Sequence, residues 1–126
     1  MLFVIGGMRQ GQLDVAKKLL NSDDADAADC SFCSFEEPMS AEIIDGYHLL
    51  IKRMLKDGRD AYAYTESLLE ANPDVCIVMD EIGCGVVPAD PFEREYRETA
   101  GRIGCVIADR AESVYRVFCG IPTKLK

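Results

Sequence analysis

The sequence lacks the features that membrane proteins and nucleic-acid-binding proteins need. Its opening apolar stretch, residues 1–5, runs straight into two glycines, whereas a membrane-spanning helix needs about 20 apolar residues. We therefore expect no signal peptide and no membrane span, and a cytoplasmic location. The formal net charge is −8. Because a phosphate backbone requires clustered Lys and Arg, we also expect no nucleic-acid partner.

Lys and Arg are absent from one whole segment, residues 21–50. That segment carries the acidic residues Asp23, Asp24, Asp26, Asp29, Glu36, Glu37, Glu42 and Asp45. Such a composition predicts a solvated loop and helix surface, and the alternative is the neighbourhood of a divalent cation. The chain as a whole is 48% apolar over 126 residues, which suffices for one core of ordinary size.

Metal-binding patterns are scarce as well. Cys30 and Cys33 have the C-x-x-C spacing of zinc and thiol-redox sites, but the sequence has no second C-x-x-C and only one histidine, His48. A structural zinc ion needs four ligands. Free cysteine commonly serves as a small core residue. We therefore predict core positions for these cysteines and no metal site.

Apolar periodicity and turn residues predict alternating strands and helices. The expected strands are residues 2–5, a short strand within 27–35 that ends near Asp29, residues 75–79, residues 113–118 and a short strand after residue 120. The expected helices are residues 13–20, about 40–56, 61–71 after an Asp60 cap, and a long one after Pro91. Alternation of this kind indicates one α/β domain over residues 1–126, with a mostly parallel sheet flanked by helices.

The expected helix over residues 40–56 is apolar on more than one side. Its apolar residues are Ile43, Ile44, Tyr47, Leu49, Leu50, Ile51, Met54 and Leu55. A sheet face buries only one stripe of such a helix. We therefore predict a homo-oligomer in which a partner subunit covers the second stripe.

A glycine-rich segment between the first strand and the first helix has the spacing of a phosphate-binding loop. The candidate nucleotide-binding residues are Gly6, Gly7, Met8, Arg9, Gln10, Gly11, Gln12 and Leu13. In the P-loop pattern G-x-x-x-x-G-K-[ST], backbone N–H groups wrap the phosphates, the lysine reaches their oxygens and the hydroxyl binds Mg²⁺. Here Gln12 replaces the lysine and Leu13 replaces the serine or threonine. The chain therefore keeps the glycine spacing of the P-loop pattern but lacks its charged and its metal-binding side chain.

Three motifs in the last third of the chain resemble a known family. They are Asp80-Glu81-Ile82-Gly83-Cys84-Gly85-Val86-Val87-Pro88, the Arg94-x-Tyr96-Arg97-x-x-x-Gly101-Arg102 pattern, and the Gly120-Ile121-x-x-Lys124-x-Lys126 ending. Together they resemble the adenosylcobinamide kinase / adenosylcobinamide-phosphate guanylyltransferase enzymes, whose phosphate loop also matches at Arg9. The resemblance is strongest over residues 80–126, weaker over 1–16 and hardly visible over 17–79.

The resemblance implies a P-loop NTPase-like fold, GTP or ATP with Mg²⁺, a corrinoid substrate of cobalamin biosynthesis and a trimer. It makes Asp29 a candidate Mg²⁺-associated carboxylate, and Glu81 a candidate substrate residue at the end of a parallel strand. The family segment that carries the guanylylated histidine is shortened here. One alignment makes His48 the catalytic nucleophile, and the other gives it a structural role. Asp80 also departs from the family pattern, which has Asn at that position.

Three functions are compatible with these residues. Loss of the lysine and the hydroxyl at positions 12 and 13 predicts a corrinoid- or nucleotide-binding relative with weakened or lost turnover. The alternative is an active compact kinase or nucleotidyltransferase acting on adenosylcobinamide, with Arg9, Asp29 and Glu81 in place of the usual set. A structural module without a ligand is the third hypothesis.

Overall fold

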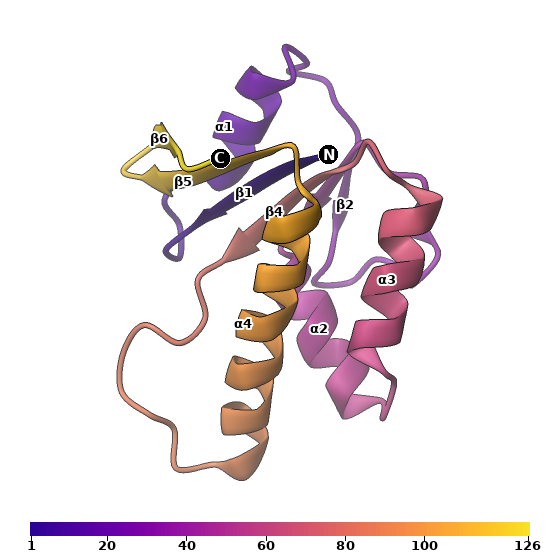
Figure 1. Ribbon diagram of the computed structural model, residues 1–126, viewed down its shortest axis with the longest axis vertical. Helices are drawn as coiled ribbons and strands as arrows, with labels where there is room; N and C mark the ends of the chain where they lie inside the picture. The colour runs from indigo at the N-terminus through magenta and orange to yellow at the C-terminus, as the bar shows by residue number, and fades with distance from the viewer.

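A six-stranded sheet runs through the centre of the molecule in the order β2-β3-β4-β1-β5-β6 (Figure 1). The computed structural model describes residues 1–126. The strands are β1 (Leu2–Gly6), β2 (Ala27–Asp29), β3 (Ile43–Asp45), β4 (Cys76–Asp80), β5 (Ser113–Phe118) and β6 (Ile121–Lys124). All neighbouring strands are parallel except β6, which runs antiparallel to β5. The predicted α/β class with a mostly parallel sheet is therefore confirmed.

Four helices cover the two faces of the sheet. They are α1 (Gln12–Leu19), α2 (Tyr47–Lys56), α3 (Ala61–Ala71) and α4 (Pro91–Arg110), and a short 3₁₀ helix spans Glu37–Met39. Helix α1 lies on one face, and α2, α3 and α4 lie on the other (Figure 1). None of these helices is both long enough and apolar enough to span a bilayer.

Adjacent residues of each central strand enter two different cores. Val4 and Val78 pack toward α1, whereas their neighbours Phe3 and Ile77 pack toward α2, α3 and α4. This follows from the period of two in a strand, because successive side chains point to opposite faces. Both faces are covered, and for that reason these strands have continuous apolar sequences rather than alternating ones.

Side-chain caps fix the starts of α3 and α4. The Asp60 carboxylate accepts hydrogen bonds from the N–H groups of Tyr62 and Ala63, both at 3.0 Å. Asp90 accepts one from Phe92 at 2.9 Å, and Pro91 occupies the first turn, where its missing N–H is not needed. The predicted Asp60 cap and the predicted helix after Pro91 are both confirmed.

The predicted helix over residues 40–56 is wrong in its first part. Residues Ile43–Asp45 form β3, and α2 begins only at Tyr47, after Gly46 turns the chain with φ 74°. A short run of apolar residues does not distinguish a buried strand from a helix by periodicity. Ile43 and Ile44 are fully buried between neighbouring strands within one chain. The second apolar stripe that was expected to require a partner subunit therefore does not exist.

Candidate functional site

The glycine-rich loop lies at the carboxyl end of β1 and leads into α1. Two of its residues have a left-handed backbone, Arg9 with φ 57° and Gly11 with φ 85°. Gly6 faces β5 so closely that a Cβ atom there would lie 2.5 Å from the carbonyl oxygen of Val117. Glycine at position 6 is therefore required by the approach of two neighbouring strands, and glycine at position 11 by its backbone conformation.

Several amide groups of this loop are unused. The N–H groups of Met8, Arg9 and Gly11 donate no hydrogen bond within the protein, and α1 has no side-chain cap at its N-terminus. Unpaired amides at the start of a helix are the groups with which a phosphate-binding loop holds an anion. The backbone of the loop thus keeps donors for a negatively charged ligand.

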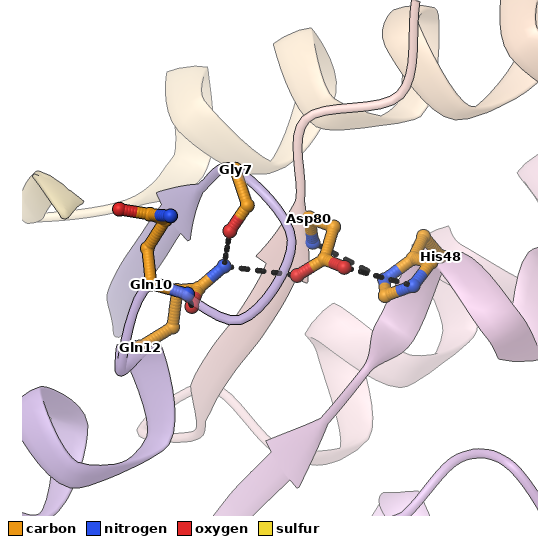
Figure 2. Close-up of polar contacts among 5 residues, drawn as sticks. All are labelled: Gly7, Gln10, Gln12, His48 and Asp80. Carbon is orange, nitrogen blue, oxygen red and sulfur yellow. Dashed lines mark hydrogen bonds and ion pairs between the residues drawn. The ribbon is translucent and has the colours of Figure 1, made fainter. Parts of the chain in front are cut away.

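The side chain of Gln12 fills the inside of the loop, as Figure 2 shows. Its Oε1 accepts a hydrogen bond from the N–H of Gln10 at 3.0 Å, and its Nε2 donates to the carbonyl oxygen of Gly7 at 2.6 Å. The same Nε2 donates to Asp80 Oδ1 at 2.9 Å. Gln12 is only 5% exposed. The neutral side chain of Gln12 therefore already accepts the hydrogen bond of one loop amide, that of Gln10.

The turn between β5 and β6 holds the opposite side of the loop. The N–H of Cys119 donates to Gln10 Oε1 and the N–H of Gly120 donates to the Gln10 carbonyl oxygen, both at 2.8 Å. Gln10 is thus bonded to the turn by its side chain and by its backbone. The shape of the loop depends on these distant residues as well as on its own glycines.

Both ring nitrogens of His48 face Asp80 (Figure 2). His48 Nδ1 accepts a hydrogen bond from the Asp80 N–H at 3.1 Å, and Nε2 lies 3.6 Å from Asp80 Oδ2. Because Nδ1 accepts, the neutral ring carries its proton on Nε2. Burial lowers the pKa of His48, and the Asp80 carboxylate opposes that shift. This geometry favours a role in positioning Asp80, while the nucleophile assignment stays a prediction.

The lowered pKa of His48 gives a testable pH dependence. Below its ordinary pKa of 6.5, an unfolded histidine takes up a proton more readily than the folded one, so protonation lowers the free energy of unfolding. We expect the stability that His48 contributes to be present above about pH 6.5 and to be lost as the pH falls toward the lowered folded-state pKa.

The control for this experiment is His48→Asn, which offers the Asp80 N–H an acceptor that does not titrate. Urea unfolding of both proteins between about pH 7.5 and about pH 5.5 measures the difference in unfolding free energy. We expect the parent to lose stability relative to the variant as the pH falls. A difference that stays constant over this range would show that His48 is not held neutral by burial.

Acidic side chains follow three adjacent strands at the same edge of the sheet. Asp29 ends β2, Asp45 ends β3 and Asp80 ends β4, and Asp29 and Asp45 are register partners. Burial raises the pKa of Asp45, and the neighbouring carboxylates of Asp29 and Asp80 raise it further. Raised carboxyl pKa values in a cleft are typical of functional sites.

A cavity of about 340 Å³ joins the loop to part of this acidic edge. Its lining includes Arg9, Gln12, Asp14, Asp45 and Asp80. Asp29 is not part of the lining, and its carboxylate instead accepts hydrogen bonds from the N–H and hydroxyl of Ser31. The sequence pattern did not indicate Asp45 as a site residue, because the helix expected over residues 40–56 includes it. The Asp45-Gly46 pair, a common turn signal, marked the end of the strand.

Glu81 points away from the loop. Its carboxylate forms a two-point ion pair with Arg116, with Nε–Oε1 at 2.9 Å and Nη2–Oε2 at 3.1 Å. The candidates Asp29 and Glu81 are therefore not brought together with the loop, whereas Asp80 and Asp45 are.

The residues at this edge do not form a Mg²⁺ site by themselves. No three His, Cys, Asp or Glu side chains are arranged to hold a metal ion, and Leu13 offers no hydroxyl. Cys30 and Cys33 are buried and free, and burial together with the adjacent Cys33 thiol raises the pKa of Cys30. That environment stabilises the thiol over the thiolate that metal binding and redox chemistry require.

Comparison with known proteins gives consistent matches. The family model for cobinamide kinase / cobinamide phosphate guanyltransferase matches residues 33–125. Over 52 residues the chain is 38% identical to the bifunctional adenosylcobalamin biosynthesis protein CobU of Salmonella typhimurium, covering 41% of this chain and 29% of that protein, and CobU of Escherichia coli gives the same values. The corresponding protein CobP of Pseudomonas aeruginosa is 38% identical over 64 residues, covering 51% of this chain and 37% of that protein.

The family match adds residues 33–79 to the resemblance and does not include the glycine-rich loop. The chain aligns with only about a third of the length of these relatives. The family match begins at residue 33, so the expectation that residues 17–79 hardly resemble the family is wrong for residues 33–79. The glycine-rich loop lies outside the residues that the family model matches, and its interpretation depends on its own geometry.

Proposed function

Because the chain belongs to the cobinamide kinase / cobinamide phosphate guanyltransferase family, we propose that it serves adenosylcobalamin biosynthesis or salvage as a corrinoid- or nucleotide-binding protein whose nucleotide turnover is weakened or lost. The named relatives are bifunctional adenosylcobalamin biosynthesis proteins, and this proposal carries their pathway to the present chain. It does not carry over their activity, since the chain aligns with about a third of their length.

The position of Gln12 is the observation that supports reduced turnover. A lysine at that place brings a positive charge to the phosphate oxygens, whereas Gln12 is neutral and bonds the loop from within. Loss of a single preorganised donor to the transition state typically slows a reaction by ~10²–10³. Leu13 removes the metal-binding hydroxyl in addition, so two contributions to phosphoryl transfer are missing at adjacent positions.

The acidic edge supports the second candidate, an active compact kinase or nucleotidyltransferase. Mg²⁺ is commonly bound by one or two carboxylates together with the phosphates of the substrate. Asp45 and Asp80 line the same cavity as the loop, and Arg9 adds a positive charge there. A nucleotide bound in this cavity would therefore bring phosphates close to carboxylates of the required kind.

Calorimetric titration of the purified protein with ATP, GTP and cobinamide, each with and without Mg²⁺, separates the candidates. We expect binding of cobinamide or of one nucleotide, with little dependence on Mg²⁺. When cobinamide and nucleotide are combined, we expect no formation of ADP, GDP or pyrophosphate. Binding that requires Mg²⁺ and is followed by turnover would establish the active enzyme. Absence of binding to all three compounds would favour the third hypothesis, a structural module without a ligand.

We also propose that the protein forms a homo-oligomer, with a trimer favoured. The support now comes from the β5–β6 hairpin, where Phe118 and Ile121 face each other across the strands and are 72% and 68% exposed. Adjacent exposed apolar side chains of this kind commonly mark an association surface. Light scattering of the sample used for titration tests this, and a mass of 13.9 kDa would contradict it.

A further inference from the structure

A second cavity lies on the α4 side of the sheet, away from the glycine-rich loop. It has a volume of about 370 Å³, within the range of small-molecule sites. Phe3, Met79 and Val114 of the sheet line it from one side, and Ala100, Gly104 and Ala108 of α4 line it from the other. Asp80 and Glu81 also line it at the end of β4, and Glu81 is paired with Arg116. Its interior is therefore mainly apolar and suits the apolar part of a ligand.

Two glycines of α4 keep this cavity open. Glycine inside a helix destabilises it relative to alanine, so its presence needs a reason. A Cβ atom on Gly101 would meet no atom within 4 Å, and one on Gly104 would meet only Met79 Cε at 3.9 Å. Neither glycine is required by the packing of the folded chain, and both line the cavity. Larger side chains at these positions would fill it.

An adjoining cavity of about 650 Å³ forms the entrance to the apolar cavity, and this entrance carries positively charged side chains. It shares Ile82, Cys84, Gly101 and Cys105 with the apolar cavity, and its charged lining residues are Arg94, Arg97, Arg102 and Glu98. Arg97 donates to the carbonyl oxygens of Gly83 and Val86, and Arg94 donates to that of Ala89. These partners are neutral carbonyl groups, so neither Arg94 nor Arg97 is paired with a carboxylate, whereas Arg102 pairs with Glu98 at 2.7 Å. Three arginines at one entrance are notable in a chain with a net charge of −8.

The loop over this entrance depends on the same arginines. Residues 82–89 make no backbone–backbone hydrogen bond, and the side chains of Arg94 and Arg97 provide the contacts that hold their carbonyl groups. A segment held by side chains alone adjusts at lower cost than one paired in a sheet. The entrance can therefore change its shape around a bound molecule.

From this geometry we propose that the α4 cavity binds a small organic anion, with an apolar ring system between α4 and the sheet and an acidic group at the arginine-lined entrance. Charge complementarity selects the acidic group, because carboxylate, sulfonate and phosphate groups pair strongly with guanidinium. The apolar lining selects the ring system. The proposal does not depend on the function proposed above, since no residue of the glycine-rich loop lines this cavity, although Asp80 lines both this cavity and the one beside the loop.

The probe for this site is 8-anilinonaphthalene-1-sulfonate, which combines an apolar ring system with a sulfonate. We expect saturable fluorescence enhancement with one dye bound per chain. Gly104→Leu should weaken binding at least tenfold by filling the cavity, and Gly104→Ala should weaken it less. Arg94→Gln should weaken binding several-fold and reduce its dependence on salt. Circular dichroism of each variant checks the fold, and Gly104→Ala keeps the test valid if the leucine variant does not fold.

Cysteine alkylation locates the dye, because the chain supplies its own control. Cys105 lines both cavities, whereas Cys119 is exposed in the β5–β6 turn and lines neither. We expect bound dye to slow the reaction of Cys105 with N-ethylmaleimide and to leave the rate at Cys119 unchanged. Equal protection of both cysteines, or undiminished binding to Gly104→Leu, would place the dye elsewhere and overturn the proposal. A change in mass of Gly104→Leu by light scattering would overturn it as well, by assigning this surface to contact between copies of the chain.

Discussion

Replacing Gln12 by lysine and Leu13 by serine is expected to raise the affinity for ATP or GTP by about ten- to a hundredfold in the presence of Mg²⁺. A hydrogen bond to a charged group contributes about 1.5–3 kcal/mol, and each 1.4 kcal/mol changes an affinity about tenfold. The double substitution restores a cation and a metal-binding hydroxyl to a loop whose Met8, Arg9 and Gly11 amides are free. Calorimetric titration of the parent and the variant measures the change.

The control variant Gln12→Met separates two effects of the substitution. It removes the three hydrogen bonds of Gln12 and adds no charge, so any gain it shows comes from release of the Gln10 amide. A lysine at position 12 would also face Asp80, which would compete with phosphate for the charge. We therefore expect the addition of Asp80→Asn to raise the affinity further. If the double variant binds no better than the parent even with Asp80→Asn added, the loop is not a phosphate site and the structural module gains support.

Gly6→Ala is expected to lower the free energy of unfolding by about 1–3 kcal/mol or more. The added methyl group would lie 2.5 Å from the carbonyl oxygen of Val117, which is backbone and moves only if β1 and β5 separate. Those two residues are register partners in the middle of the sheet. Urea unfolding measures the effect as a shift in the transition midpoint.

The neighbouring glycine supplies the matched control for this experiment. A Cβ atom on Gly7 would meet only the side chain of Gln10, at 3.5 Å, and Gly7 does not have a positive φ. Gly7→Ala should therefore change the free energy of unfolding by less than about 0.5 kcal/mol. Equal midpoints for the two variants would mean that the loop and β5 yield easily, and that the glycine at position 6 is not a steric requirement.

Most elements could be predicted from the sequence, and β3 could not. Helices α3 and α4 have side-chain caps at Asp60 and Asp90, and β4 is a continuous apolar run. Strand β3 is three residues long, and only its position between β2 and β4 distinguishes it from a helical turn. That pairing is a property of the whole sheet. The error over β3 also concealed Asp45, whose place at the sheet edge follows from the strand.

The candidate site could be predicted in its backbone but not in its side-chain contacts. The glycine spacing of residues 6–11 indicated an anion-binding loop, and the free amides agree with it. The bond from Gln12 to Asp80 joins residues that are 68 positions apart, which no local pattern reveals. Asp80 and Glu81 are adjacent at the end of β4, and successive side chains there point in opposite directions. Asp80 consequently reaches the loop, whereas Glu81 reaches Arg116.

The attachment of Gln10 to the β5–β6 turn also sets an order of events during synthesis on the ribosome. Gln10 and Cys119 are separated by 109 positions, so the residues of the loop are made long before the turn that holds them. At translation speeds of about 5–20 residues per second, the loop waits roughly 5–20 s for that turn. Until then its glycines leave it free to sample many conformations. A ligand that depends on the final shape of the loop would therefore bind only after β5 and β6 have paired.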